Sequence, residues 1–381
     1  MTEGQDAGIR IVAVRNAREM DRFIKLPMRL HADDPHYIAP LILERREAFS
    51  PRHNPYFSHA EVQFWLACRD GRDVGRISAQ VDRQQKDSVF GQFGLIAAED
   101  DAVVFKALFD TAEAWLRERG RTRIQGPFNL SINEETGLLI EGFDTPPMLL
   151  MGHDKPYVGV RVEQQGYAKA KDLIAYLYGV EHELPRAVHR LITRRRPEEL
   201  TVRTLDMRRY REEVFTMMHV FNDAWADNWG FVPFTEAEIA HMAKSMRPLI
   251  DARLCAIAEM RGEMVGFGIT LPNLNEAIRG FGGRVLPFNW AKLLWRLKVR
   301  HTKTCRTLLM GINRKFQHTG VVGAMAPFLI IDKMRERTLA LGMKQCELSW
   351  ILEDNLPMRH INEALGSDPY KIYRVYEKQL A

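Results

Sequence analysis

The sequence predicts a mixed α/β (α+β mixed sheet) protein built from two consecutive domains of the same topology. Its 381 residues exceed the usual size of one domain. Residues 306–334 give a short apolar run, a polar loop with glycine and a helical pattern in succession. The order strand, helix, hairpin, strand, helix, strand also occurs twice, which is a repeat of pattern and not of sequence identity.

The first domain is assigned to residues 1–195 from apolar periodicity and turn signals. Its expected elements are a strand at Ile9–Val14, a helix at Glu19–Leu30, a hairpin with strands at Val62–Cys68 and Val74–Val81, a strand at Gly91–Ala97, a helix capped by Asp100 and Asp101 and ending at Gly120, and a strand from Arg123.

The second domain is assigned to residues 196–381 on the same grounds. Its expected elements are a strand at Thr201–Leu205, a helix at Tyr210–Ala226, a hairpin with strands at Leu254–Glu259 and Met264–Thr270, a strand at Arg306–Ile312, a loop at Asn313–Thr319, a helix from Gly320, a strand at Glu347–Asn355 with a helix after it, and a last strand at Tyr370–Tyr376.

The strand, loop and helix of residues 306–334 predict an anion site. Free backbone N–H groups and the positive end of the helix dipole meet at such a helix start. Gly320 and Gly323 allow a phosphate-bearing ligand to approach the backbone closely.

Residues 317–324, Gln-His-Thr-Gly-Val-Val-Gly-Ala, resemble the (Gln/Arg)-x-x-Gly-x-(Gly/Ala) pyrophosphate loop of the GNAT superfamily of acyl-CoA-dependent N-acyltransferases. Val322 departs from this pattern, since Gly323 comes one residue late. Asn355 matches the family's Asn that meets the pantetheine arm, and Leu365-Gly366 resembles its closing glycine. The resemblance implies acyl-CoA as donor substrate, bound by Met310, Gly311, Ile312, Gln317, His318, Thr319, Gly320, Val321, Val322, Gly323 and Asn355.

The first domain lacks a comparable loop. Glu99, Asp100 and Asp101 stand where a pyrophosphate would need hydrogen-bond donors. Carboxylates cap a helix well but repel phosphate, so this domain is not expected to bind acyl-CoA.

Acyl transfer to an amine needs a backbone donor for the thioester carbonyl, a deprotonated amine and an acid for the leaving thiolate. Glu347 and Glu353 are candidate bases on the strand opposite the thioester, or else ordinary salt-bridged carboxylates. His153, next to Asp154, is a further candidate base, or else a structural histidine. No Ser or Cys stands in a nucleophile motif, so direct attack by the amine is expected.

The family's frequent acid is a Tyr on the helix after Asn355, and Asn362 occupies that place. An amide cannot protonate a thiolate, so Tyr370, Tyr373 or solvent has to serve, and Tyr373 is our catalytic candidate.

Residues 284–303 form an insertion relative to the GNAT pattern. Two Trp, several Leu and a basic face are typical of an interfacial amphipathic helix, although a helix docked on the protein itself has the same pattern. Five residues are candidates for binding the substrate. Trp290 and Trp295 lie in this insertion, Asn133 and Glu134 in the irregular stretch after Gln125, and Trp229 in the Asn-Trp-Gly-Phe segment.

Composition excludes several other classes of protein. The net charge of +5 is mild and no basic stripe with aromatics is present, which argues against nucleic acid as a partner. Four scattered Cys without a C-x-x-C pair predict buried thiols and no metal. The N-terminus has no secretory pattern, so a cytoplasmic protein, peripheral on the inner membrane, is expected.

Nearly the whole chain resembles a group of bacterial tandem GNAT proteins that includes the bacterial ceramide synthases. This implies N-acylation of a primary amine, with a sphingoid-type lipid as acceptor and the membrane reached through residues 284–303. Two alternatives stay open, a soluble acetyltransferase of small amines or peptides and a non-catalytic GNAT pair that binds CoA.

Overall fold

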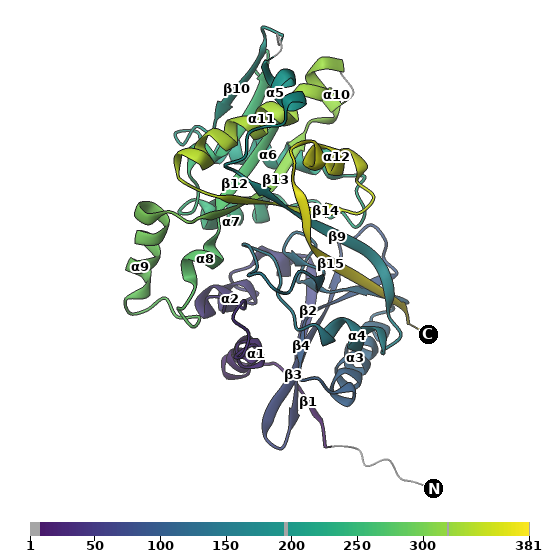
Figure 1. The fold of residues 1–381 in the computed structure, drawn as a ribbon. Helices are drawn as coiled ribbons and strands as arrows, with labels where there is room; N and C mark the ends of the chain where they lie inside the picture. Colours follow the sequence, from purple (N-terminus) through teal and green to yellow (C-terminus); the bar gives the residue numbers. More distant parts are fainter. Residues whose placement is uncertain (1–7, 194–196, 318–319, 381) are drawn as a thin grey trace. The chain divides into compact units, whose positions relative to one another are not determined.

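The computed structural model describes residues 8–193, 197–317 and 320–380 (Figure 1). Contacts divide the described chain into two units. Unit 1 takes the residues up to Leu173, Ile278–Val285 and those from Lys371 onward, and unit 2 takes Ile174–Ala277 and Leu286–Tyr370. The boundary therefore crosses strands β9 and β15, each of which supplies one end to each unit.

Unit 1 contains a sheet in the order β1-β2-β3-β4-β5-β15, with β8 also paired to β15. Its elements are β1 (Arg10–Ala13), α1 (Ala17–Leu30), α2 (Ile42–Ala48), η1 (Pro55–Ser58), β2 (Ala60–Arg69), β3 (Arg72–Asp82), β4 (Phe90–Ala98), α3 (Ala102–Arg117), β5 (Arg123–Gly126), β6 (Phe128–Asn129), β7 (Glu135–Thr136), β8 (Leu138–Glu141), α4 (Tyr157–Glu163), the start of β9 (Ala168–Gly179) and the end of β15 (Asp368–Gln379).

The two faces of this sheet carry separate apolar cores. Helix α3 begins at Asp101, whose carboxylate accepts the Val103 N–H at 2.8 Å, and packs its apolar stripe on one face. Helix α1 begins at Asn16 in the same manner and covers the other face through Phe23 and Ile24. Successive side chains of a strand point to opposite faces of the sheet, so each strand contributes to both cores.

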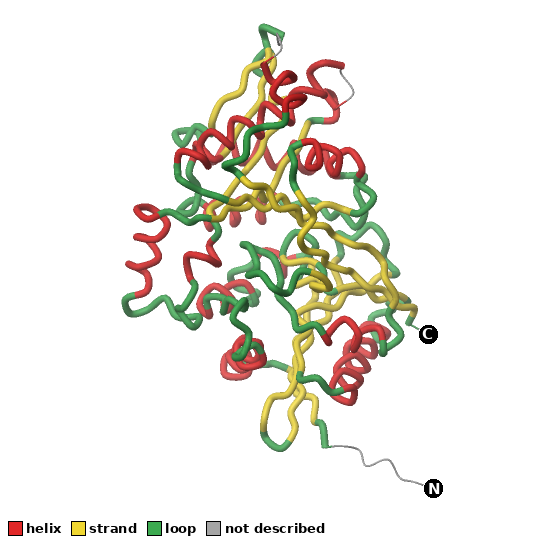
Figure 2. Tube along the Cα trace, viewed as in Figure 1, coloured by secondary structure: helices red, strands yellow, loops and turns green. Residues whose placement is uncertain are grey.

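Unit 2 contains a sheet in the order β9-β14-β13-β12-β11-β10 (Figure 2). Besides the ends of β9 and β15, its elements are α5 (Arg186–Thr193), β10 (Leu200–Thr204), α6 (Tyr210–Trp225), α7 (Glu236–Met246), η2 (Ala252–Leu254), β11 (Cys255–Met260), β12 (Glu263–Pro272), α8 (Leu274–Ile278), α9 (Asn289–Trp295), the π-helix η3 (Arg296–Arg300), β13 (Thr304–Ile312), α10 (Arg314–Gln317), α11 (Gly320–Ala340), β14 (Gln345–Leu352) and α12 (Leu356–Ala364).

Helices α11 and α6 lie on opposite faces of the unit 2 sheet. A Cβ placed on Gly268 of β12 would lie 2.8 Å from Ile330 of α11. A Cβ on Gly311 of β13 would instead lie 3.7 Å from Ala224 of α6. Gly311 is paired with Phe267, the residue before Gly268, so the two glycines face opposite sides.

The structure confirms most of the expected elements, including both hairpins and the helix within the insertion, here α9 followed by η3. Other features differ from expectation. Strand β9 and helices α2, α4, α5, α7 and α8 were not expected, and α10 forms within the predicted loop at Asn313–Thr319. The stretch expected to be irregular after Gln125 contains the short strands β6, β7 and β8. All four Cys are buried free thiols, as expected.

Within the described ranges, the structure has no helix with the length and apolar character required to cross a bilayer.

Asp251 links η2 to α11 through ion pairs, and we expect its contribution to the free energy of unfolding to depend on pH. Its carboxylate caps η2 and pairs with Arg253 and with Arg337 of α11, each at 3.0 Å. Burial alone would raise the pKa of Asp251, but the hydrogen bonds from Arg253 and Arg337 outweigh burial and lower it to about 2.

Asp251→Asn should lower the free energy of unfolding by about 1–2 kcal/mol at neutral pH. Because the folded-state pKa lies below the unfolded one, this contribution is complete above roughly pH 4 and is lost as the pH falls toward 2. Thermal unfolding from pH 7 to pH 3 should show the difference in Tm shrinking with acid. Asp144→Asn, at an exposed carboxylate, is the control. A difference that grows with acid would contradict this account.

Candidate active site

Strands β13 and β14 separate in the middle of the unit 2 sheet. Their parallel pairing joins Thr304–Thr307 to Gln345–Leu348 and ends there, although β13 continues to Ile312 and β14 to Leu352. On its other side, β13 stays paired with β12 up to Ile312. The two parallel strands therefore open into a V whose β13 arm ends in the predicted donor segment 310–312.

A bulge lies where β13 leaves its partner. Thr270 pairs with Thr307 and Ile269 with Leu309, so Leu308 has no opposite residue in β12. Beyond the bulge, the indole Nε1 of Trp225 donates to the Met310 carbonyl at 3.2 Å. The Trp225 ring also lies edge-on to Trp350 of β14, with centroids 6.0 Å apart. Trp225 of α6 thus contacts the β13 arm of the V, and Trp350 belongs to the β14 arm.

The short helix α10 and then helix α11 follow the β13 arm of the V. Gln317 donates from Nε2 to the Ile312 carbonyl at 2.8 Å and fixes the turn between β13 and α10. A Cβ on Gly323 would lie 2.5 Å from the Phe316 carbonyl oxygen, so this glycine permits the close approach of α10 to α11. Gly320 has positive φ and open space around it, and Val321 is 50% exposed. His318 and Thr319 lie outside the described residues.

The first turn of α11 thus presents backbone to open space, as an anion site requires. Val322 is buried and packs with the α11 core, so the residue that departs from the family pattern points away from this opening. Asn355 is half-buried and caps α12, accepting the Met358 N–H at 3.2 Å. Both ends of the predicted acyl-CoA site are therefore helix starts in unit 2.

Glu347 of β14 is the centre of a buried polar network. Its side chain is fully buried, and its carboxylate accepts hydrogen bonds from Ser349 Oγ at 2.5 Å and from the Tyr370 hydroxyl. Arg306 lies 3.5 Å from the same carboxylate and also donates to Ser349. Tyr370 is half-buried, so it links the enclosed carboxylate to the surface of the unit.

The other acid–base candidates of this region lie elsewhere. Glu353 is half-buried just after β14, and its backbone carbonyl accepts from Arg359. Tyr373 belongs to unit 1, where it is fully buried in β15 and paired with Leu139. Asn362 is buried on α12, and its Nδ2 has no hydrogen-bond partner among the described residues. Of the two tyrosines, the structure brings Tyr370 and not Tyr373 to Glu347.

Unit 1 has the corresponding pair of parallel strands, but the space between them is closed. Strand β4 pairs with β5 over Phe90–Gln92 and then bulges around Leu95. The chain after β5 stays against β4, because a Cβ on Gly94 would lie 1.8 Å from the Phe128 carbonyl oxygen. The Leu95 N–H is bound by Asn129 Oδ1 at 2.8 Å. In unit 1, the Phe128 backbone and the Asn129 side chain therefore occupy the space that corresponds to the V of unit 2.

The carboxylates before α3 are bound by arginines. Glu99 pairs with Arg29 and Arg72, and Asp101 pairs with Arg69 at 2.7 Å. Asp101 also caps the helix, so its carboxylate covers the backbone donors that a phosphate would use. By contrast, the two residues that open α10 in unit 2 are basic, Arg314 and Lys315.

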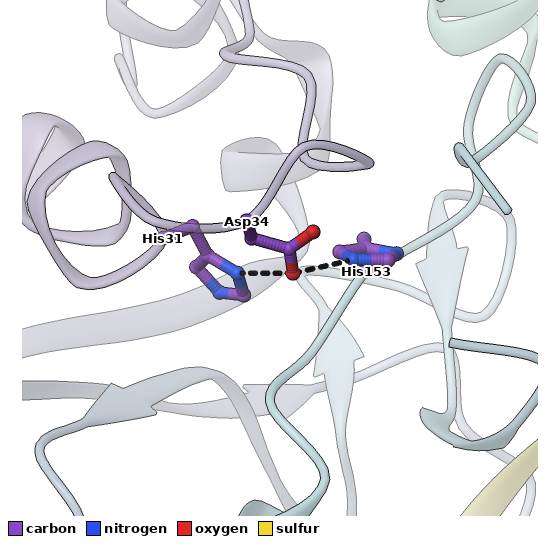
Figure 3. A group of neighbouring side chains, drawn as sticks. All are labelled: His31, Asp34 and His153. Atoms are coloured by element: carbon purple, nitrogen blue, oxygen red, sulfur yellow. Dashed lines mark hydrogen bonds and ion pairs between the residues drawn. The ribbon is translucent and has the colours of Figure 1, made fainter. Parts of the chain in front are cut away.

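His153 lies in unit 1 with two other polar side chains, His31 and Asp34 (Figure 3). Its Nε2 is 3.0 Å from Asp34 Oδ2. Its sequence neighbour Asp154 is not its partner, since Asp154 accepts the Leu139 N–H instead. Burial lowers the pKa of His153, and burial lowers that of His31 to about 4.

The substrate candidates of unit 1 lie next to a half-buried ion pair that the sequence did not predict. Glu134 is exposed and Asn133 half-buried, whereas the next residue, Glu135, binds Arg45 of α2 and accepts from Asn129 at 3.0 Å. Nothing in the sequence near Glu135 points to Arg45, because the two are 90 positions apart.

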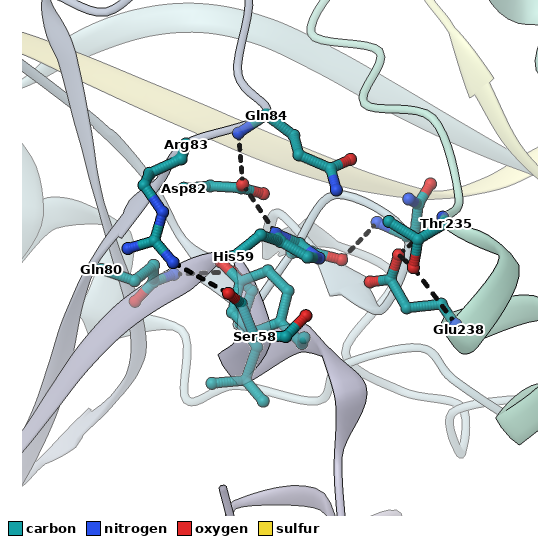
Figure 4. Close-up of polar contacts among 12 residues, drawn as sticks. Ser58, His59, Gln80, Asp82, Arg83, Gln84, Thr235 and Glu238 are labelled. Atoms are coloured by element: carbon teal, nitrogen blue, oxygen red, sulfur yellow. Dashed lines mark hydrogen bonds and ion pairs between the residues drawn. The ribbon is translucent and has the colours of Figure 1, made fainter.

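A second buried His–Asp pair lies near η1. His59 Nδ1 is 2.9 Å from Asp82 Oδ1, and the same oxygen accepts the Gln84 N–H at 2.8 Å (Figure 4). Arg83 donates to the Ser58 carbonyl beside it. Among the described residues, this pair has no third metal-ligating side chain.

The insertion exposes its apolar side chains. Those of α9 and its flanks are among the most exposed large apolar residues of the described chain, namely Leu286, Phe288, Trp290, Leu294, Trp295 and Val299. Trp290 is 51% and Trp295 48% exposed, whereas Leu297 of η3 is buried. Trp229 is half-buried in the turn after α6. The insertion therefore docks through η3 and leaves α9 uncovered within its unit.

The fold and the sequence both have known counterparts, although no family model matches the chain. A tandem GNAT protein from the clavulanic acid biosynthesis pathway superposes with a TM-score of 0.58 at 12% identity, over 98% of this chain and 99% of that one. A GCN5-related N-acetyltransferase from Sphaerobacter thermophilus gives 0.53 at 15% identity, over 98% and 96%. The fold is therefore that of the tandem GNAT proteins.

Two relatives are much more similar in sequence. Bacterial ceramide synthase of Caulobacter vibrioides (strain NA1000 / CB15N) is 52% identical over 99% of both chains. Protein YghO of Escherichia coli (strain K12) is 42% identical over 96% of this chain and 94% of its own. The chain belongs to the bacterial ceramide synthase family of GNAT-type, acyl-CoA-dependent N-acyltransferases.

Proposed function

We propose that this protein transfers a long-chain acyl group from acyl-CoA to the primary amine of a sphingoid-type lipid. The observation that carries the proposal is the open V between β13 and β14, which leads to the start of α11, where Gly320 has open space around it. The similarity to a ceramide synthase supports the choice of acceptor.

Acyl-CoA is assigned to unit 2 alone. The pyrophosphate would bind the backbone N–H groups at Gly320–Gly323, and the predicted contacts of His318 and Thr319 remain part of this proposal. The pantetheine arm would enter the V beside Asn355, with the thioester carbonyl at the backbone of Met310–Ile312. Unit 1 is proposed to bind no acyl-CoA, because Phe128 and Asn129 fill the equivalent space.

Proton transfer is assigned to Tyr370 and Glu347. The amine nitrogen attacks the thioester carbon, a C–N bond forms, and the C–S bond then breaks to release CoA thiolate. The amine proton passes to the Tyr370 oxygen while the Tyr370 proton passes to the buried Glu347 carboxylate. The proton returns along the same path to the thiolate, which gives CoA thiol. Roles for His153, Glu353 and Tyr373 remain predictions.

The acceptor lipid is proposed to arrive from a membrane surface through residues 284–303. Exposed Trp and Leu side chains at the start of this insertion, with Lys292, Lys298 and Arg300 exposed beside them, fit the interface of an anionic bilayer. This surface also supports the proposed peripheral association with the inner membrane. Trp229, Asn133 and Glu134 remain predicted acceptor contacts.

The function is tested by CoA-thiol release with acetyl-CoA and with palmitoyl-CoA, each with and without a sphingoid base. Release that requires both the long chain and the base is the expected result, with the N-acyl product identified by mass spectrometry. Release with acetyl-CoA and a small amine would identify a soluble acetyltransferase. Bound CoA without release under all conditions would identify a non-catalytic binder.

The double variant Trp290→Ser, Trp295→Ser should bind vesicles of phosphatidylglycerol and phosphatidylcholine roughly tenfold less tightly or worse, because the two indoles supply much of the exposed apolar area. Co-sedimentation measures this. The matched control is Leu43→Ser, Val160→Ser, at unit 1 positions that are 54% and 55% exposed. Equal binding by both variants and the wild type would show that the insertion is not the membrane contact.

A further inference from the structure

The His31, Asp34 and His153 side chains form a cluster in unit 1, and the proton path proposed through Tyr370 and Glu347 uses none of them. We propose that these three side chains bind one divalent transition-metal ion of the zinc type. Two imidazoles and one carboxylate are a ligand set that such ions favour. The expectation from sequence was that no metal binds.

The spacing of the three ligand atoms fits one ion. Asp34 Oδ2 lies 3.0 Å from His153 Nε2 and 3.7 Å from His31 Nδ1, and all ligand atoms of the cluster lie within 4.8 Å of one another. Tetrahedral zinc, with bonds of about 2.0–2.1 Å, separates its ligands by about 3.3 Å. The observed distances fall on both sides of that value, so small side-chain movements suffice.

An unsatisfied atom gives a second, independent reason. The side chain of His31 is 6% exposed, and its Nδ1 is buried without a hydrogen-bond partner among the described residues. This nitrogen faces Asp34 Oδ2 at a distance too long for a hydrogen bond (Figure 3). A buried polar atom without a partner is costly, and a metal ion between the two rings and the carboxylate would satisfy it.

The surroundings hold the ligands in place. Asp34 Oδ1 accepts the His36 N–H at 2.9 Å, which leaves Oδ2 toward the two imidazoles. The His31 ring stacks on Tyr37, with centroids 4.4 Å apart. His31 ends α1, Asp34 lies in the turn that follows, and His153 comes from the loop before α4. A metal here would join two segments 119 residues apart and leave a coordination position for water.

The test uses tag-free, full-length protein that has been freed of metal with a chelator. Titration with Co²⁺, read by visible absorbance, should show about one equivalent bound with the spectrum of a tetrahedral site, and Zn²⁺ should displace it. Zn²⁺ should also raise the Tm of the wild type, since the ion binds only the folded state. Asp34→Asn and His153→Asn should each weaken binding about 100-fold or more.

His59→Asn is the matched control, since it removes a buried imidazole from a His–Asp pair for which the described part of the chain offers no third ligand. It should keep the full cobalt stoichiometry. Where Asp34→Asn does not fold, His31→Asn replaces it. The proposal is overturned if the wild type binds no Co²⁺ or Zn²⁺, or if Asp34→Asn and His153→Asn bind as the wild type does. These readouts do not depend on acyl transfer, so they separate this proposal from the proposed function.

Discussion

Replacing Val321 with Glu should weaken acyl-CoA binding by roughly 30- to 100-fold. Val321 is the second residue of α11 and is 50% exposed, so the new carboxylate would stand at the proposed pyrophosphate site without disturbing the core. Like charges a few ångströms apart at a protein surface repel by about 2–3 kcal/mol, which sets the expected range. Isothermal titration with palmitoyl-CoA measures the dissociation constant, and thermal unfolding verifies that the variant folds.

Unit 1 provides a closely matched control for this change. Val103 is also the second residue of a helix, α3, and is 48% exposed. Val103→Glu introduces the same charge at the corresponding helix start, where the structure has no open V behind it. It should leave acyl-CoA binding unchanged. If both variants lose affinity equally, the loss reflects net charge; if neither does, the pyrophosphate does not bind at α11.

Replacing Glu347 with Gln should lower kcat by about 100-fold, with KM for palmitoyl-CoA changed less than about threefold. The amide keeps the size of the side chain but is a far weaker proton acceptor for Tyr370. The variant should also be less stable, by about 3 kcal/mol, because Arg306 would be left without a buried anionic partner. Tyr370→Phe should lower kcat about tenfold with a smaller change in stability.

A substitution at Glu113 is the control that separates a loss of catalysis from a loss of stability in Glu347→Gln. This buried glutamate of unit 1 accepts the Tyr167 hydroxyl at 3.1 Å and pairs with Lys378 at 2.7 Å, much as Glu347 does with Tyr370 and Arg306. Glu113→Gln should therefore lower the Tm but leave kcat per folded enzyme unchanged. If Glu347→Gln behaves in the same way, Glu347 serves the fold and not the proton transfer.

Local patterns allowed much of the fold and part of the site to be predicted. The strand at Arg306–Ile312 and the helix from Gly320 follow from apolar periodicity within a few residues, and both form where expected. The two hairpins follow from turn residues between strand-forming runs. Strand β9 was not predicted, and its first residues, Ala-Lys-Ala-Lys-Asp, contain no β-branched or aromatic residue that would favour a strand.

The chemistry of the site was harder to predict because it depends on residues distant in sequence. Glu347 was a candidate, but its pairing with Tyr370 spans 23 positions and joins two strands, β14 and β15, that are separated in sequence by helix α12. His153 was matched with its neighbour Asp154, whereas its partner Asp34 lies 119 positions earlier. Side chains of adjacent residues in extended chain point in different directions, so sequence neighbours are poor guides to contacts.

The exchange of chain segments between the two units limits how the protein can be divided. Ile174, Tyr176 and Tyr178 of β9 belong to a core of unit 2 although they precede residue 196, and the last residues of the chain belong to unit 1. A gene fragment starting at residue 196 would thus lose β9, which contributes to a core of unit 2, and keep the end of β15, which belongs to unit 1. We therefore expect that a truncation or fusion at the midpoint separates each unit from residues of its own core and yields insoluble fragments.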